Sequence, residues 1–169
     1  MVKEHLVTPK NLDLALELYR SIFPNENPNN TCFEESGAPD FHYCIVYDST
    51  VDQPMGFPVG IRGLYTEKAD PESAFLGWFG VLEQFRRQRY GTRILKFFEE
   101  DAKANGYKYA RIYTEETNEV ARRFYEFAGY TCETLDYDTT DYAGEQVVIY
   151  SKTLCDDPVP PWNNRKLEF

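Results

Sequence analysis

The chain has 169 residues, of which 42% are hydrophobic and 16% aromatic; this is enough for the core of one folded domain and too little for two of ordinary size. Eighteen basic against 28 acidic residues give a net charge of −10, which argues against general nucleic-acid or anionic-membrane binding and favours cationic partners. The N-terminus has no signal-peptide pattern and the longest apolar run is nine residues, so we expect a soluble, cytoplasmic protein.

The first half of the chain is predicted to contain a short strand, a helix, a long loop and three further strands. Between Pro9 and Phe23, apolar residues recur every three or four positions, which is typical of an amphipathic helix, and Pro24 ends it. The loop at 25–40 is rich in Asn, Pro, Glu and Gly, with one helical turn expected at 31–36. The predicted strands are 5–8, 41–47, 56–65 and 73–82, with turns at 48–54 and 66–72.

The strand at 73–82 is apolar on both faces and is therefore predicted to be central in a sheet that is covered on each side. Gly77 and Gly80 are unusual in such a strand, where glycine often marks a bulge or the close approach of another backbone or a ligand. A short loop leads from this strand into a helix predicted at 90–104, which Asn105 and Gly106 close.

Arginines crowd the start of that helix, at positions 86, 87, 89 and 93, although the chain as a whole is acidic. A helix start leaves several backbone N–H groups without partners and carries a partial positive charge. The combination favours a bound polyanion such as a pyrophosphate. On charge alone, a solvated cationic helix start is an equally good interpretation.

The second half is predicted to alternate strands and helices. A strand at 107–113 is followed by a helix that Asn118 or Thr117 caps and Gly129 ends. Val120, Phe124 and Phe127 are expected to form its apolar face. Two strands, 132–137 and 145–154, follow on either side of a turn at 138–144.

The C-terminal tail, residues 155–169, contains three prolines and is predicted to be extended. Trp162 could pack the tail on the body of the protein or on a second subunit of a homodimer, and a loose tail is the alternative. The order of the predicted elements indicates an α+β fold with a mixed sheet.

Two segments of the sequence together resemble motifs A and B of the GNAT family of N-acetyltransferases. The first runs from Arg86 to Gly91 and follows the pattern Arg/Gln-x-x-Gly-x-Gly/Ala, although Arg89 replaces a glycine that the family usually has and Arg87 one that it often has. The second begins 26 residues after Thr92, and 118–130 matches Asn-x-x-Ala-x-x-(Phe/Leu)-Tyr-x-x-x-Gly-(Phe/Tyr) at every position.

The resemblance covers roughly residues 5–154 and implies a GNAT-like domain over 1–154, with 155–169 as its tail. It implies a mostly antiparallel central sheet that is flanked by helices and splayed at the central strand, leaving a slot for the pantetheine arm of acetyl-CoA. Main-chain groups of the strand would pair with the pantetheine, and backbone N–H groups of the loop would hold the pyrophosphate. The implied cofactor-binding residues are Phe79, Gly80, Val81, Arg86, Arg87, Gln88, Arg89, Tyr90, Gly91, Thr92, Asn118 and Tyr125.

The resemblance makes Tyr125 the general acid that protonates the departing thiolate. A phenol with a pKa of about 10 is protonated at neutral pH and can donate that proton. The family's two positions for a basic glutamate hold Phe75 and Tyr113 here. Glu115, Glu72 or a chain of water molecules is therefore the candidate base.

We therefore expect an N-acetyltransferase that uses acetyl-CoA and acts on a primary amine of a small molecule or peptide. The loop at 25–40 contains four acidic residues, which suits a cationic amine; they are Glu26, Glu34, Glu35 and Asp40. The alternative is a CoA-binding sensor or interaction module with little or no turnover.

No metal site is expected. The cysteines are Cys32, Cys44, Cys132 and Cys155. None forms a Cys-x-x-Cys pair, and the two histidines, His5 and His42, are not spaced as ligands. We expect reduced thiols, with Cys44 packed in the core.

Overall fold

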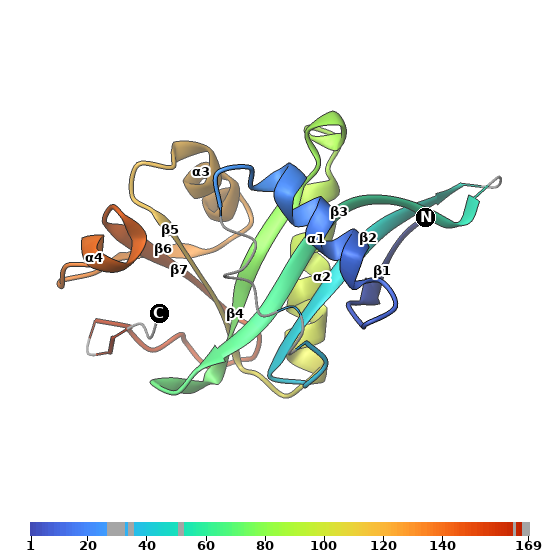
Figure 1. Ribbon diagram of the computed structural model, residues 1–169. Coiled ribbons are helices and arrows are strands. Elements are labelled where there is room, and N and C mark those ends of the chain that lie inside the picture. The colour runs from blue at the N-terminus through green and yellow to red at the C-terminus, as the bar shows by residue number, and fades with distance from the viewer. Residues whose placement is uncertain (27–32, 34–35, 51–52, 164, 167–169) are drawn as a thin grey trace. The chain divides into compact units, whose positions relative to one another are not determined.

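A computed structural model describes residues 1–26, 33, 36–50, 53–163 and 165–166 (Figure 1). The chain forms two compact units: unit 1 is Met1–Tyr65 with Leu76–Asp101, and unit 2 is Thr66–Phe75 with Ala102–Phe169. The strands are β1 (Val2–Leu6), β2 (Phe41–Thr50), β3 (Gln53–Glu67), β4 (Asp70–Val81), β5 (Tyr109–Glu115), β6 (Thr131–Thr134) and β7 (Val147–Thr153). The helices are α1 (Leu12–Ile22), the 3₁₀ turn η3 (Glu83–Phe85), α2 (Tyr90–Ala104), α3 (Glu119–Phe127) and α4 (Thr140–Ala143).

The strands hydrogen-bond in the order β1-β2-β3-β4-β5-β7-β6, and β4–β5 is a parallel pair in an otherwise mostly antiparallel sheet. The β4–β5 pairing joins Ser73–Phe75 to Tyr109–Arg111, although β4 continues to Val81 and β5 to Glu115. The α+β class, the mixed sheet and its splay at the central strand are therefore confirmed. A single domain over 1–154 remains a prediction.

In unit 1 the helices cover both faces of the strands. α1 crosses β2 and β3 in Figure 1 and buries Ala15, Leu18, Tyr19 and Ile22, which confirms the helical period in this part of the sequence. Ile94 of α2 packs with Val46 and Val59 in a second core cluster. α1 begins at Leu12 rather than at Pro9 because Asn11 closes a turn in which its side-chain oxygen accepts from the N–H of Thr8 at 2.7 Å.

All three predicted turns contain regular structure, and at 66–72 only 68–69 lie between β3 and β4. Most of 48–54 belongs to the long β2–β3 hairpin, where the register shifts between Asp48 and Thr50 mark an irregularity. In the turn at 138–144, Asp138 accepts from the N–H of Thr140 at 2.9 Å and α4 begins there. The helical turn expected at 31–36, with Cys32, Glu34 and Glu35, lies mainly outside the described residues.

A buried arginine ties α2 to three strands of unit 1. The Arg62 guanidinium is fully buried; it donates to Asp101 at 2.7 Å and forms a second ion pair with Glu4. His42 lies between the same carboxylate of Asp101, at 2.5 Å, and the carbonyl oxygen of Ala38, at 2.9 Å. The partners come from β1, β2, β3 and α2, so this network holds α2 in place on the strands.

The Asp101 carboxylate should make the stability of the protein depend on pH in acid. Burial raises its pKa, but the hydrogen bond from His42 and the charge of Arg62 outweigh this and leave the pKa below its ordinary value. A depressed folded-state pKa stabilises the protein above the ordinary pKa of about 4, and that contribution is lost as pH falls through the folded value. We expect Asp101→Asn to lower the free energy of unfolding at neutral pH and to flatten its acid dependence. Urea unfolding at a series of pH values would measure this, with the exposed Asp13→Asn as the control.

In unit 2 different elements pack on the two faces of the β5–β7–β6 layer. Tyr150 of β7 faces α3, where its ring lies 5.6 Å from that of Tyr125. The next residue, Ser151, points to the opposite face and contacts Arg111 there at 2.9 Å. Arg111 also binds the carbonyl oxygen of Pro160 at 2.7 Å, so this part of the tail packs on the body of unit 2.

Among the described residues, no helix is both long enough and apolar enough to cross a membrane. Cys44 is buried, as predicted, and burial raises the pKa of its thiol to about 12. In the part of the chain that the structure describes, no cluster of three or more His, Cys, Asp and Glu side chains is arranged to hold a metal ion.

Candidate functional site

The loop between β4 and α2 has a backbone that arginine rarely adopts. Arg87 has a φ of 61° and Arg89 a φ of 67°, both in the left-handed region that favours glycine. The side chains of both residues are exposed. The loop thus has left-handed backbone at the two positions where the GNAT pattern often or usually has glycine, and its guanidinium groups point outward.

The same loop presents a series of backbone donors. The first helical hydrogen bond of this segment runs from the N–H of Arg93 to the carbonyl oxygen of Arg89, at 3.2 Å. Within the described residues, the backbone N–H groups of 87–92 donate to no other group of the chain. An anion placed at this helix start would therefore meet several converging donors and the positive end of the helix dipole.

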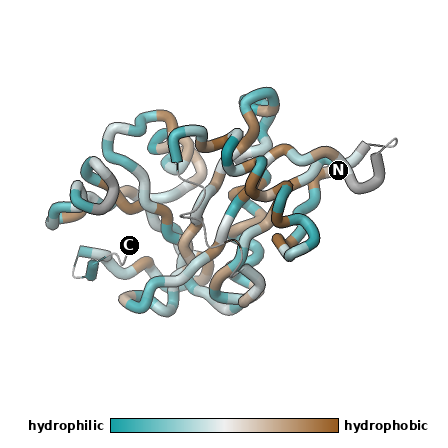
Figure 2. The backbone as a smooth tube through the Cα atoms, viewed as in Figure 1, coloured by the Kyte–Doolittle hydropathy of each residue, from teal (hydrophilic) through white to brown (hydrophobic). Residues whose placement is uncertain are grey.

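The arginine side chains add positive charge to these donors. Arg86, Arg87, Arg89 and Arg93 are all exposed, and among the described residues none of them forms an ion pair with a carboxylate. The Nε of Arg86 donates to the carbonyl oxygen of Val81 at 3.1 Å, which ties the loop to the end of β4. Figure 2 shows the loop as a mostly hydrophilic stretch after the apolar β4.

The start of α2 is anchored by Tyr90. Its hydroxyl group donates to Asp48 of β2 at 2.6 Å. This hydrogen bond lowers the pKa of the Asp48 carboxyl and raises the pKa of the Tyr90 hydroxyl. The hydroxyl is therefore engaged within unit 1, and the part of Tyr90 in cofactor binding stays a prediction.

The central strand β4 has a distortion where the sequence has its two glycines. Between Gly77 and Gly80, Trp78 has a φ of 44°, which is rare for an aromatic residue and marks an irregular point in the strand. A Cβ on Gly80 would lie 2.2 Å from Cγ2 of Ile22, so the close approach predicted there is that of a side chain of α1. Gly60 of β3 in turn approaches the carbonyl oxygen of Gly80. Phe79, Gly80 and Val81 are each partly exposed.

In unit 2, Asn118 caps α3. Its side-chain oxygen accepts from the backbone N–H of Ala121 at 3.1 Å. Glu119 lies in the first turn, where a negative charge favours the helix dipole, and Gly129 follows the helix with a φ of 90°. The predicted start and end of this helix are therefore confirmed.

We expect Asn118→Ala to destabilise the protein by about 1 kcal/mol, because the cap would be lost. Asn118→Asp retains an oxygen acceptor and should have nearly unaltered stability. Urea unfolding of the two variants would measure the difference. Equal stability of both variants would contradict a capping role.

Tyr125 is the buried residue of α3, with 7% of its surface exposed. Its ring packs 5.6 Å from that of Tyr150 and 6.2 Å from that of Tyr130. Burial, and secondly the negative charge of Glu115, raise the pKa of the Tyr125 hydroxyl well above its ordinary value. The phenol therefore keeps its proton throughout the neutral range.

The two candidate bases differ in their surroundings. Glu115 ends β5 with an exposed side chain, and its negative charge contributes to the raised pKa of Tyr125 in the same unit. Glu72 is about half exposed and forms an ion pair with Lys108 at 2.6 Å. The cationic loop at 86–93 belongs to unit 1, whereas Asn118, Tyr125 and both glutamates belong to unit 2.

Sequence reasoning missed the buried hydroxyl that holds α3 on β7. The hydroxyl of Tyr150 donates to Glu126 at 2.8 Å and accepts from Nε of Arg122 at 3.1 Å. Arg122 and Glu126 of α3 thus contact the strand beside the buried Tyr125. The predicted apolar face is wrong in part, since Val120 is 83% and Phe127 95% exposed. The spacing of Arg122 and Glu126, four positions apart, could have suggested that both side chains lie on the same side of the helix.

Comparison with known proteins agrees with the resemblance that the two sequence motifs showed. A family model described as the acetyltransferase (GNAT) family matches residues 10–130. No curated protein matches the chain.

Solved structures of several acetyltransferases share the fold. A Bacillus subtilis acetyltransferase in complex with CoA is 16% identical, with a TM-score of 0.70 over 92% of this chain and 100% of its own. The ribosomal-protein-S18-alanine N-acetyltransferase of Escherichia coli is 14% identical, with a TM-score of 0.67 over 94% and 97%. A GNAT family acetyltransferase from Elizabethkingia anophelis with acetyl-CoA bound is 15% identical, with a TM-score of 0.64 over 90% and 97%.

Proposed function

Since the chain belongs to the acetyltransferase (GNAT) family, we propose that it transfers the acetyl group of acetyl-CoA to a primary amine of a small molecule or peptide. The observation that carries the proposal is the loop before α2. It combines left-handed backbone at Arg87 and Arg89, exposed guanidinium groups and unpaired backbone donors at 87–92 in one short segment. This donor set fits the charge and the oxygen atoms of a pyrophosphate.

The proposed roles follow from what each group can donate or accept. Backbone N–H groups of 87–92 and the arginine side chains would hold the phosphates, and the main chain of 79–81 would hold the pantetheine arm. Acetyl-CoA supplies the activated thioester. The amine nitrogen attacks the thioester carbonyl carbon, the C–S bond breaks, and the Tyr125 hydroxyl gives its proton to the departing sulfur. The Tyr125 phenol is protonated at neutral pH, as a proton donor must be when this step begins.

The nitrogen must also lose a proton in the reaction. We propose Glu115 as the acceptor of this proton, directly or through water, because its carboxylate is exposed at the end of β5 and its negative charge acts on the Tyr125 hydroxyl. Glu72 is a weaker candidate, since Lys108 already occupies its carboxylate. An amine acceptor with positive charge suits the exposed Glu26 and Asp40 that bound the loop between α1 and β2.

The alternative is a protein that binds CoA but turns it over slowly or not at all. Phe75 and Tyr113 stand where the GNAT pattern often has a basic glutamate, and Phe75 is fully buried. This alternative makes the same prediction for binding and the opposite one for turnover.

Two measurements test the proposal. Calorimetric titration with acetyl-CoA should give binding in the micromolar range, and a library of primary amines should include one that releases the CoA thiol in an enzyme-dependent way. Binding without release by any amine would favour the CoA-binding module. No binding of acetyl-CoA would overturn both functions.

A further inference from the structure

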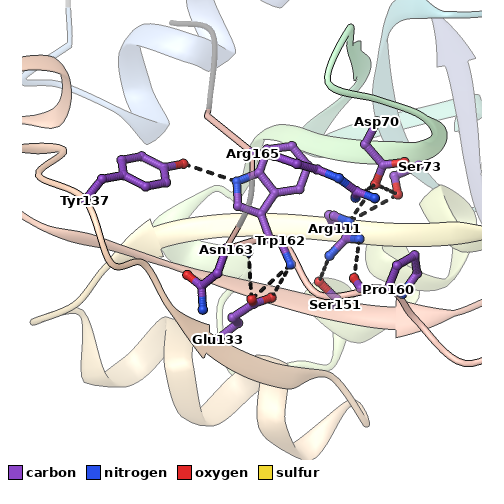
Figure 3. A network of polar contacts seen from close by, with 10 residues as sticks. All are labelled: Asp70, Ser73, Arg111, Glu133, Tyr137, Ser151, Pro160, Trp162, Asn163 and Arg165. Atoms are coloured by element: carbon purple, nitrogen blue, oxygen red, sulfur yellow. Dashed lines mark hydrogen bonds and ion pairs between the residues drawn. The ribbon is translucent and has the colours of Figure 1, made fainter.

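In unit 2 the C-terminal segment takes part in a dense polar network, which Figure 3 shows, through Pro160, Trp162, Asn163 and Arg165. Trp162 is fully buried, and its backbone N–H donates to both carboxylate oxygens of Glu133, at 2.8 and 2.9 Å. The N–H of Asn163 donates to the same carboxylate at 2.9 Å, and the indole N–H donates to Tyr137 at 3.2 Å. Trp162 therefore packs on the body of unit 2, which is one of the alternatives that the sequence left open.

Arg111 is the hub of this network. It is fully buried, and each of its three guanidinium nitrogens has a partner. Nε donates to Asp70 at 2.9 Å and to Ser73 at 3.1 Å, which lie at the start of β4. Nη1 donates to Ser151 of β7 at 2.9 Å, and Nη2 to the carbonyl oxygen of Pro160 at 2.7 Å. One side chain thus joins β4, β5, β7 and the tail.

The indole of Trp162 completes the cluster. Two guanidinium groups lie near its ring centroid, that of Arg111 at 5.2 Å and that of Arg165 at 5.6 Å. Arg165 forms an ion pair with Asp70 at 3.0 Å, so one buried carboxylate is shared by two arginines. The ring of Phe75 meets the indole edge-on at 5.4 Å.

These contacts converge on one point of the sheet. Phe75 and Arg111 form the last register pair between β4 and β5, after which the strands no longer pair. Trp162 contacts both members of that pair. An indole could be buried at many other places on the β5–β7–β6 layer, most of which lies away from the last β4–β5 register pair. Burial alone therefore does not explain why Trp162 lies at that pair.

We propose that Arg111 and Trp162 are positioning residues that fix the place at which β4 and β5 separate. The inference rests on the proposed acetyl transfer, since β4 continues to the proposed pantetheine-binding residues 79–81 and β5 to Glu115. A small displacement at the last register pair grows along both strands. Misplacement of reacting groups by about 1 Å can reduce turnover about a hundredfold. The arginine-rich loop lies outside this network, so acetyl-CoA affinity should depend on it much less.

The central variant is Trp162→Ala, compared with Lys166→Ala, which changes an exposed residue of the same tail. Three quantities are measured: amide hydrogen exchange, acetyl-CoA affinity by calorimetry, and thiol release with the best amine of the library. We expect Trp162→Ala to lose exchange protection in 70–75 and 109–113 while α2 keeps its protection. Turnover should fall about tenfold to a hundredfold with little change in acetyl-CoA affinity. Lys166→Ala should match the unaltered protein in all three.

The other outcomes are equally decisive. Retained turnover in Trp162→Ala would overturn the positioning role, whether or not protection at 70–75 is lost. If α2 also loses protection, the Trp162→Ala variant has unfolded, and a second variant, Arg111→Lys, decides the question. Lysine keeps the positive charge but loses the forked hydrogen bonds of the guanidinium. Unchanged turnover in Arg111→Lys would overturn the inference. If the unaltered protein does not bind acetyl-CoA, the proposed function fails, and hydrogen exchange alone still tests whether the tail holds the strand pair.

Discussion

Tyr125→Phe should lower the turnover number about a hundredfold and leave acetyl-CoA affinity nearly unchanged. The variant removes one hydroxyl group, and loss of a positioned general acid typically costs a factor of about 10² to 10⁴. The hydroxyl makes no hydrogen bond to any residue that the structure describes, so the fold should not suffer from its loss. Thiol release measured at saturating acetyl-CoA would give the turnover number, and calorimetry the affinity.

Tyr130→Phe is the matched control, because it removes a phenol from the same aromatic cluster and leaves Tyr125 intact. Its turnover should resemble that of the unaltered protein. An equal fall in both variants would assign the effect to packing of the cluster. Full activity in Tyr125→Phe would show that another group, such as water, protonates the thiolate.

The pH dependence provides a second test of the same role. Burial and the charge of Glu115 raise the pKa of Tyr125 above the ordinary value of about 10. The acid form therefore persists at neutral and moderately alkaline pH, and loss of its proton cannot reduce turnover until the pH passes the raised pKa. A fall in turnover between about pH 7 and pH 9 that disappears in Tyr125→Phe would contradict this assignment. Glu115→Gln should lower the pKa of Tyr125, because the nearby negative charge is removed.

Local sequence signals predicted much of the fold. The apolar stripe and the closing Asn105–Gly106 placed the helix at 90–104, and α2 has those bounds in the structure. The cap at Asn118 and the end at Gly129 were also predicted, because both depend on neighbouring residues alone. The motifs at 86–92 and 118–130 carried the resemblance to the family that the comparisons then showed.

Contacts between distant residues could not be predicted in the same way. Trp162 is bound by Glu133 and Tyr137, and Arg111 joins residues 38 to 49 positions away in the sequence. No periodic pattern specifies such pairs. The exposure of Val120 and Phe127 could not be predicted either, since α3 contacts β7 through Tyr150, which lies 24 and 28 positions away from its partners Glu126 and Arg122. The left-handed backbone at Arg87 and Arg89 could not be predicted from the arginines themselves, which have no preference for it; the only signal was the glycine that the GNAT pattern has at these positions.

Replacing both Arg87 and Arg89 by alanine should weaken acetyl-CoA binding about a hundredfold. Each exposed guanidinium can form charge-assisted hydrogen bonds with phosphate, and one such bond contributes about 1.5 to 3 kcal/mol. Exposure to water places each of the two arginines at the lower end of that range, and the two losses together give about a hundredfold. Calorimetric titration at two salt concentrations would measure the loss, and the affinity of the double variant should depend less on salt. Lys96→Ala, which removes an exposed charge elsewhere on α2, is the control.

The variant in which glycine replaces both Arg87 and Arg89 distinguishes the effect of the loop's charge on acetyl-CoA affinity from the effect of its backbone conformation. A left-handed conformation costs a residue with a Cβ about 1 to 2 kcal/mol, and glycine avoids this cost. The glycine variant should therefore be more stable to urea than the alanine variant while having the same loss of charge. If the arginine charges hold the phosphates, the two variants will bind acetyl-CoA equally weakly. If the shape of the backbone decides affinity, the glycine variant will bind as tightly as the unaltered protein, and the arginines will be shown to be tolerated in this loop rather than used by it.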